Sequence, residues 1–155
     1  MPPRILQQTQ IHFLCAAALC TIFSVTAKAD TVINGCTIIE RPINNLRTRC
    51  PGVDLSGQNL AGMDLSQADF TGANLSGADL SGTNFGEANL SNANFNTANL
   101  SNASLWRTTL TNTTLAATTL TGARTNLVLS CPANLPIGWH CLPILYTYSS
   151  GFTKK

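Results

Sequence analysis

A large apolar residue recurs at every fifth position through the middle of this chain. In an α-helix, which turns about 100° per residue, a step of five would wind these residues around every face. In a flat strand they would alternate between the two faces. The period therefore predicts a coil with one straight segment per five residues and a corner between segments. The fourteen positions are Leu55, Leu60, Leu65, Phe70, Leu75, Leu80, Phe85, Leu90, Phe95, Leu100, Leu105, Leu110, Leu115 and Leu120.

The residues between the apolar positions fit the same coil. A small residue, usually Ala, precedes most of them by two positions, so both should face inward within one straight segment. The Asp or Asn between them should face outward. Gly and Asn tolerate the positive φ that a tight turn can require. We expect them at the corners, at Gly57, Gly62, Gly72, Gly77, Gly82, Asn92, Asn102 and Asn112.

The A(D/N)LXX repeat, as in Ala78-Asp79-Leu80, resembles that of the pentapeptide repeat family. The resemblance implies an all-β fold, the right-handed quadrilateral (four-sided) β-helix. It also implies four repeats per coil and about 3.5 coils over residues 53–124.

A coil of four repeats makes a further prediction, because it stacks residues twenty apart. Each Asp then has only Asn above or below it in the outward columns. An Asn amide can donate a hydrogen bond to a carboxylate, whereas two stacked carboxylates would repel each other. The columns are Asp54-Asn74-Asn94, Asn59-Asp79-Asn99, Asp64-Asn84-Ser104 and Asp69-Asn89-Thr109.

The first 29 residues have the pattern of a secretory signal peptide. Arg4 supplies a positive start, residues 13–25 are apolar, and Ala27-Lys28-Ala29 forms a cleavage pattern. Thirteen apolar residues fall short of the roughly 20 that span a bilayer, so we expect no stable membrane insertion after cleavage. The pattern predicts a secreted or periplasmic protein, or one of the thylakoid lumen in a photosynthetic organism.

Cleavage would leave a chain of nearly zero net charge. The whole sequence has nine Lys+Arg and seven Asp+Glu, and Arg4 and Lys28 would leave with the peptide, giving 7 − 7 = 0. Nucleic-acid binding normally requires a basic stripe, and none is visible. We therefore expect no nucleic-acid partner.

Four cysteines remain after cleavage, two on each side of the repeats. At about 4.8 Å per coil, the two pairs would be separated by roughly 17 Å, whereas disulfide-bonded Cα atoms lie within about 7 Å. This predicts Cys36–Cys50 and Cys131–Cys141. The alternative is a zinc site of four cysteines, or of three with His140. Neither pair has the C-x₂₋₄-C spacing of structural zinc, so we expect no metal.

Each predicted disulfide falls where an end of the coil needs a cap. Residues 30–52 contain two short apolar runs around an Asn34-Gly35 turn signal, which predicts an N-terminal cap with a hairpin. Residues 125–155 form the predicted C-terminal cap and tail, in which Pro132, Pro136 and Pro143 disfavour strand pairing. We expect the segment 146–155 to be loosely held.

No set of residues points to catalysis or to a cofactor. His140 is the only histidine outside the signal peptide, and its neighbours Trp139 and Cys141 suggest a cap residue rather than a triad member. The repeat places Asp54, Asp64, Asp69 and Asp79 on separate sides, which is unsuitable for an acid–base pair. We expect no enzyme and no cofactor.

Trp106-Arg107 is the candidate interface. This pair replaces the small residues usual at a corner, such as Ser-Gly or Ser-Asn. Trp and Arg are enriched at binding hot spots. The alternative is an indole ring that lies on a neighbouring side or a cap.

The sequence thus predicts a non-catalytic exported repeat scaffold that is structural or protein-binding, with an unknown protein partner. The alternative is a DNA mimic that binds a topoisomerase, as the resemblance allows. Residues 54–123 carry five acidic residues and Arg107, giving 1 − 5 = −4. This is a mild charge for DNA mimicry, and export would separate the protein from DNA.

Overall fold

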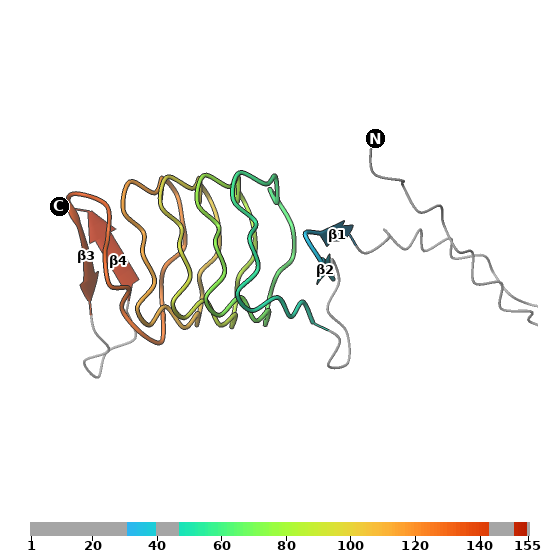
Figure 1. Ribbon diagram of the computed structural model, residues 1–155. Helices are drawn as coiled ribbons and strands as arrows, with labels where there is room; N and C mark the ends of the chain where they lie inside the picture. The colour runs from blue at the N-terminus through green and yellow to red at the C-terminus, as the bar shows by residue number, and fades with distance from the viewer. Residues whose placement is uncertain (1–30, 40–46, 143–150, 155) are drawn as a thin grey trace, which may run out of the picture.

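The computed structural model describes residues 31–39, 47–142 and 151–154. It is a β-helix, in which successive coils stack side by side along one axis (Figure 1). The named strands lie at its ends and are β1 (Thr31–Ile33), β2 (Cys36–Ile38), β3 (Trp139–Leu142) and β4 (Gly151–Lys154). The described ranges contain no α-helix, and so no helix that could cross a membrane. The predicted signal peptide, residues 1–29, lies outside the described residues.

Adjacent coils pair in parallel with an offset of twenty residues. Thirteen bridges share this offset, from Arg49↔Asp69 to Thr114↔Asn134. The backbone N–H of Leu55 donates to the carbonyl of Asn74 at 2.7 Å, and the N–H of Asn74 donates back to Val53 at 2.8 Å. Parallel pairing thus reaches beyond residues 53–124 at both ends.

The interior of the coil is a stack of the periodic apolar side chains. All fourteen are at most 2% exposed, and Ala residues such as Ala78 and Ala93 are buried beside them. Three phenylalanines meet edge to face, with ring centroids 6.3 Å apart for Phe70–Phe85 and 6.1 Å apart for Phe85–Phe95. This geometry is the favourable one for aromatic pairs.

The corners are β-turns with one left-handed residue each. Backbone φ is positive at every fifth residue from Gly52 to Leu127, a series that contains all eight expected corner residues. From Gly52 to Gly122, the N–H that follows each such residue donates to the carbonyl of the apolar residue before the corner, as from Ala73 to Phe70 at 2.9 Å. Glycine adopts this φ without steric cost, but the series also includes Thr97 and Ala117.

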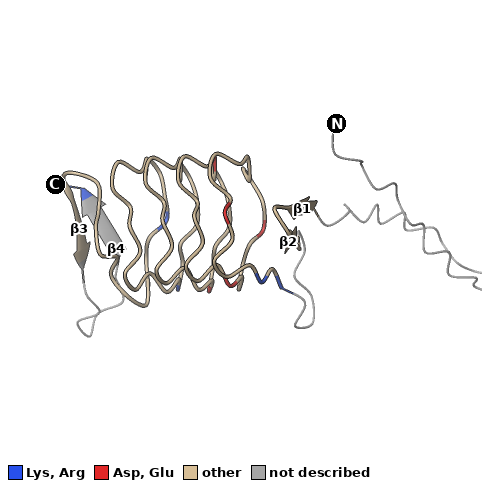
Figure 2. Ribbon diagram, viewed as in Figure 1, with Lys and Arg blue, Asp and Glu red and all other residues tan. Residues whose placement is uncertain are grey.

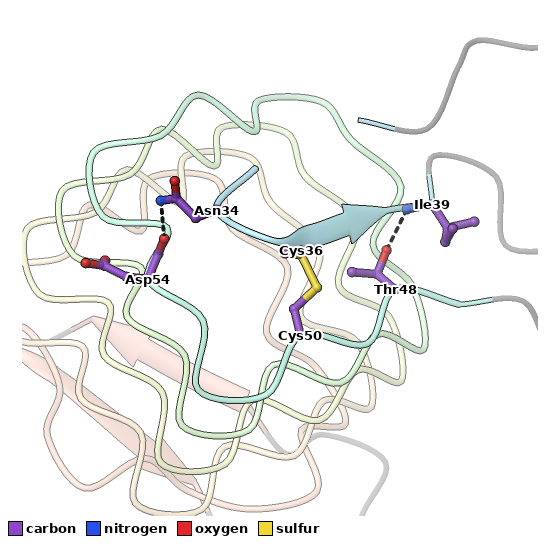
Figure 3. The surroundings of a disulfide bond; sticks show 6 residues. All are labelled: Asn34, Cys36, Ile39, Thr48, Cys50 and Asp54. Atoms are coloured by element: carbon purple, nitrogen blue, oxygen red, sulfur yellow. Dashed lines mark hydrogen bonds between the residues drawn. A yellow bond between two sulfur atoms is a disulfide. The ribbon is translucent and has the colours of Figure 1, made fainter. Parts of the chain in front are cut away.

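A hairpin covers the N-terminal end of the coil. β1 and β2 pair antiparallel around Asn34 and Gly35, whose φ values of 49° and 80° suit a tight hairpin turn. Ile38 is fully buried, and a disulfide joins Cys36 to Cys50 (Figure 3). Asn34 Nδ2 also donates to the carbonyl of Asp54 at 2.7 Å, so the hairpin continues the twenty-residue offset.

A two-stranded sheet lies at the opposite end (Figure 1). β3 pairs antiparallel with β4, in the register Trp139↔Lys154 to Leu142↔Gly151. The expectation of a loosely held C-terminal segment is therefore wrong for Gly151–Lys154, because β3 offers it a free edge to pair with. Residues 146–150 and 155 lie outside the described residues.

Candidate functional site

Trp106 and Arg107 form a corner in the C-terminal half of the coil. Arg107 is the left-handed residue of this turn, with φ of 54°. Trp106 is 38% exposed, and the side chain of Arg107 is 52% exposed. The turn thus presents a large ring and a cation where the other corners present mostly small side chains.

The indole of Trp106 lies over Gly86, the residue twenty positions earlier. A Cβ added to Gly86 would lie 3.8 Å from Cε3 of Trp106 and 3.1 Å from Oδ1 of Asn84. Gly86 lacks the positive φ of the corner glycines, so its missing side chain matters for space rather than for backbone conformation. One portion of the ring is covered by the neighbouring coil, as the alternative to an interface predicts, and another portion faces solvent.

The Arg107 guanidinium is held on two sides. Its Cζ lies 5.4 Å from the centroid of the Trp106 ring, within the range of a cation–π contact. Its Nε lies 3.8 Å from Oε1 of Glu87, and Oε2 of Glu87 accepts a hydrogen bond from Gln67 Nε2 at 3.5 Å. Gln67, Glu87 and Arg107 are each twenty residues apart and make one polar column along this corner.

The acidic residues of the described coil form no single face. Asp54, Asp64, Asp69 and Asp79 belong to four different columns of bridging residues. Figure 2 shows that few positions along the coil backbone are charged and that they lie on several coils. The DNA-mimic alternative would require the acidic groups to gather on one surface.

Three of these carboxylates accept a hydrogen bond from the Asn one coil further on, as stacking predicts. The expectation that only Asn neighbours each Asp is wrong for Asp69, because the parallel pairing begins one coil earlier than expected and places Arg49 beside it. Asn74, Asn84 and Asn99 donate Nδ2 to Asp54, Asp64 and Asp79 at 3.0, 3.0 and 3.1 Å. Hydrogen bonds from the hydroxyl and the backbone N–H of Ser56, and then from Asn74, hold the pKa of Asp54 below its ordinary value of 3.8. Ser81 and Asn99 lower the pKa of Asp79 in the same way.

The cysteines form the two pairs that the sequence predicts. Cα atoms lie 5.4 Å apart in Cys36–Cys50 and 5.9 Å apart in Cys131–Cys141. His140 lies on β3 and is exposed. Among the described residues, no three His, Cys, Asp or Glu side chains gather where they could hold a metal ion.

Trp106 and Arg107 were predictable from the sequence, but the residues that position them were missed. Within their own repeat, Gly86 and Glu87 look like ordinary corner residues. The signal is the offset of twenty, which places Gly86 under Trp106 and Glu87 beside Arg107. Reading the columns for size and charge would have found both contacts.

The family model for pentapeptide repeats matches residues 49–86 and 87–124, with eight copies of the repeat. No curated protein matches the chain significantly. Solved structures of pentapeptide repeat proteins do match it. The one from the Arabidopsis thaliana thylakoid lumen is 37% identical, with 52% of this chain and 67% of that one covered and a TM-score of 0.28.

Two cyanobacterial proteins are also similar. A Nostoc pentapeptide repeat protein is 30% identical, with 59% of this chain and 72% of that one covered and a TM-score of 0.33. A Cyanothece protein is 27% identical, with 56% of this chain and 59% of that one covered and a TM-score of 0.35. The repeat model and the twenty-residue parallel pairing together show that the chain belongs to the pentapeptide repeat family, whose fold is a right-handed β-helix.

Proposed function

We propose that this protein is a non-catalytic, exported scaffold that binds another protein at the Trp106–Arg107 corner. The observation that carries the proposal is the fixed geometry of this pair. Trp106 rests on Gly86, and Arg107 is held between the indole ring and Glu87. A binding site that is already ordered loses little conformational entropy when a partner docks.

The surroundings make this corner the best candidate on the coil. Most other exposed corner residues are small, such as Ser91-Asn92 and Ser101-Asn102, and offer little area to a partner. Trp supplies a rigid apolar surface, and Arg supplies several donors in a fixed plane. Among the side chains that the structure describes, the three other large exposed apolar ones are Val32, Leu129 and Ile137, which lie in the hairpin or after Leu127.

We propose a four-sided coil for this scaffold, with about 3.5 coils in residues 53–124. Four steps of five residues make up the twenty-residue offset of the bridges, which supports this geometry. The proposed segments are the N-terminal cap at 30–52, the coil at 53–124, and the C-terminal cap and tail at 125–155.

We propose that residues 1–29 direct export and are then removed. The two disulfides support an oxidising destination, because disulfides persist mainly outside the cytosol. The periplasm and the extracellular medium fit this chemistry. The similarity to a thylakoid lumen protein adds the lumen as a destination in a photosynthetic organism.

Affinity capture with matched variants tests the binding proposal. Residues 30–155 are immobilised and exposed to the exported proteins of the source organism, and retained proteins are compared for the native sequence, Trp106→Ala and Arg107→Ala. We expect a specific partner to be retained by the native protein and lost from both variants.

Ile137→Ala is the control, because Ile137 is a fully exposed apolar residue that follows the coil in the sequence and is not part of this corner. It should retain the partner as well as the native protein does. A partner that both corner variants retain, or that Ile137→Ala also loses, would show that the corner is not the interface.

A further inference from the structure

The two disulfides of this protein differ in their access to solvent. Cys36 and Cys50 are only 3% and 4% exposed, beneath the N-terminal hairpin. Cys131 is exposed, and Cys141 is half-buried and packs against the core. Thiol–disulfide exchange requires a thiolate to reach a sulfur atom, so access controls its rate. The fold therefore shields one disulfide and presents the other.

We propose that Cys131 is a site of thiol–disulfide exchange with dithiol reductants, and that its reduction releases the C-terminal sheet from the coil. The thiolate of a dithiol attacks Sγ of Cys131 and forms a mixed disulfide. The Cys131–Cys141 bond breaks, and Cys141 leaves as a thiolate that takes a proton from water.

The second thiol of the reductant completes the reaction. As a thiolate it attacks the reductant's own sulfur in the mixed disulfide, which closes a disulfide within the reductant and frees the Cys131 thiolate. Two electrons have then passed from the dithiol to the cystine. A disulfide oxidant reverses the sequence and is itself reduced to a dithiol, so the cap can be closed again.

The two cysteines are anchored differently, and this determines what moves after reduction. The segment containing Cys131 is hydrogen-bonded to the last coil on both sides of the cysteine. Leu129 N–H donates to Thr108 O and Ala133 N–H to Thr113 O, both at 2.8 Å, and Leu115 N–H donates to Asn134 O at 3.0 Å. This segment should remain in place.

Cys141 lies on β3, whose ladder partner is β4 rather than a coil. The disulfide cross-links this sheet to the segment bound to the coil, in addition to the backbone that connects them, and Leu135 and Trp139 pack against the core. Reduction therefore leaves β3 and β4 attached through weak apolar contacts and the connecting chain. Opening there would uncover the apolar end of the coil.

Reduction kinetics under native conditions test the exchange site. The folded protein is treated with dithiothreitol, samples are quenched with acid and alkylated, and the modified cysteines are identified by mass spectrometry. We expect Cys131 and Cys141 to be alkylated at least about tenfold faster than Cys36 and Cys50. Equal rates, or faster reduction of Cys36–Cys50, would overturn the proposal. In concentrated guanidinium chloride the two rates should converge, because the fold no longer shields either pair.

Hydrogen exchange tests the release of the cap. In the Cys131→Ser/Cys141→Ser double variant, we expect amide protection to fall in residues 139–142 and 151–154 and to persist in residues 70–110. The matched variant Cys36→Ser/Cys50→Ser should leave the C-terminal sheet protected. Unchanged protection in β3 and β4 would refute the release. A loss of protection throughout the coil would also overturn the proposal, because the disulfide would then stabilise the whole fold rather than hold the C-terminal sheet alone.

Discussion

The Asp and Asn residues of the repeat have a second role besides stacking. Their Oδ1 atoms accept a hydrogen bond from the backbone N–H two residues later, as from Ser56 to Asp54 at 3.0 Å and from Ser91 to Asn89 at 3.1 Å. Such Asx turns fix the entry to a corner. The bonds occur from Asp54 to Asn99 in the described coil, after which this position holds Ser, Thr or Arg. The stacking of these residues in outward columns was predictable from the sequence. Their hydrogen bonds to the backbone at the corners were not predicted.

Replacing Ala117 by Gly should stabilise the protein. Ala117 has φ of 55°, and the left-handed conformation costs an L-residue about 1–2 kcal/mol. Glycine avoids this cost but loses about 0.5–1 kcal/mol through its greater freedom in the unfolded chain. We expect a net gain of about 0.5 kcal/mol in the free energy of unfolding, measured by urea denaturation.

Ala116→Gly is the matched control, since Ala116 is also exposed and its φ is not positive. It should lower the free energy of unfolding by about 0.5–1 kcal/mol. Similar effects of the two substitutions would contradict the role of the corner conformation.

The lowered pKa values of Asp54 and Asp79 make stability dependent on pH in the acid range. A carboxyl group whose folded pKa lies below its unfolded value stabilises the fold above the unfolded pKa and loses this contribution as pH falls through the folded pKa. We therefore expect the urea midpoint to fall as pH decreases below about 4. The Ser56→Ala/Ser81→Ala double variant should raise both folded pKa values in an NMR titration and make the fall shallower. Unchanged pKa values in this variant would show that the serines do not hold the carboxylates.

Trp106→Ala should cost much less stability than truncation of a core ring. Part of the indole is already exposed, so we expect a loss of about 1 kcal/mol. Phe85→Ala should cost about 3–5 kcal/mol, because Phe85 is fully buried between two other rings. Thermal or urea denaturation measures both. Comparable losses would mean that Trp106 is chiefly structural.

At the scale of elements, buried threonines form hydrogen bonds between neighbouring coils. They stand at inward positions that alanine occupies in most other repeats. The hydroxyls of Thr83, Thr113 and Thr118 donate to carbonyls 23 residues earlier, at 2.8, 2.7 and 2.7 Å. The sequence predicted that these positions face inward but not that a hydroxyl there would find a partner. That partner lies on another coil, so one repeat by itself carries no sign of it.

Thr113→Val tests this link. The substitution keeps the shape of the side chain but removes the hydrogen bond to Leu90 O, so we expect a loss of about 1 kcal/mol in the free energy of unfolding. Thr109→Val is the control, because Thr109 lies on the outward face and is half-buried. It should change stability by less than about 0.5 kcal/mol. If Thr109→Val lowered the free energy of unfolding as much as Thr113→Val, the effect would come from replacing any threonine by valine and not from losing the hydrogen bond to Leu90 O.

The end elements differ in how far sequence could predict them. The N-terminal hairpin follows from its Asn-Gly turn and flanking apolar residues. β4 was missed, because four residues with one apolar side chain, Phe152, give little strand signal by themselves. Its pairing depends on the free edge of β3, which only the folded chain reveals.

At the scale of the whole molecule, each coil contacts mainly its neighbours, as in other solenoids. Sequence periodicity alone identified the buried ladder, and the distance between the coil ends favoured the two disulfide pairs. The candidate site was only half predictable. Its unusual residues were visible, but their supports Gly86 and Glu87 depend on contacts between coils.

Deletion of one full coil should be tolerated. Removing residues 56–75 joins Leu55 to Ser76 and preserves both the repeat and the twenty-residue offset. We expect a folded protein with both disulfides and a lower melting temperature, because less apolar surface is buried. Circular dichroism and disulfide mapping measure this outcome.

Removing residues 58–75 deletes two residues fewer but shifts the period. We expect this variant to misfold or aggregate, since its apolar positions no longer coincide with the inward sites of the next coil. Equal stability of the two deletions would contradict a fold governed by this offset.

The contact between Trp106 and Gly86 also has an evolutionary consequence. Changes at these two positions are coupled although they lie twenty residues apart. A bulky side chain at position 86 would occupy the space in which the indole ring of Trp106 now packs. Acquiring a large side chain at any corner therefore depends on which residue the preceding coil already carries there. New recognition surfaces in such a protein would arise by paired substitutions rather than by single ones.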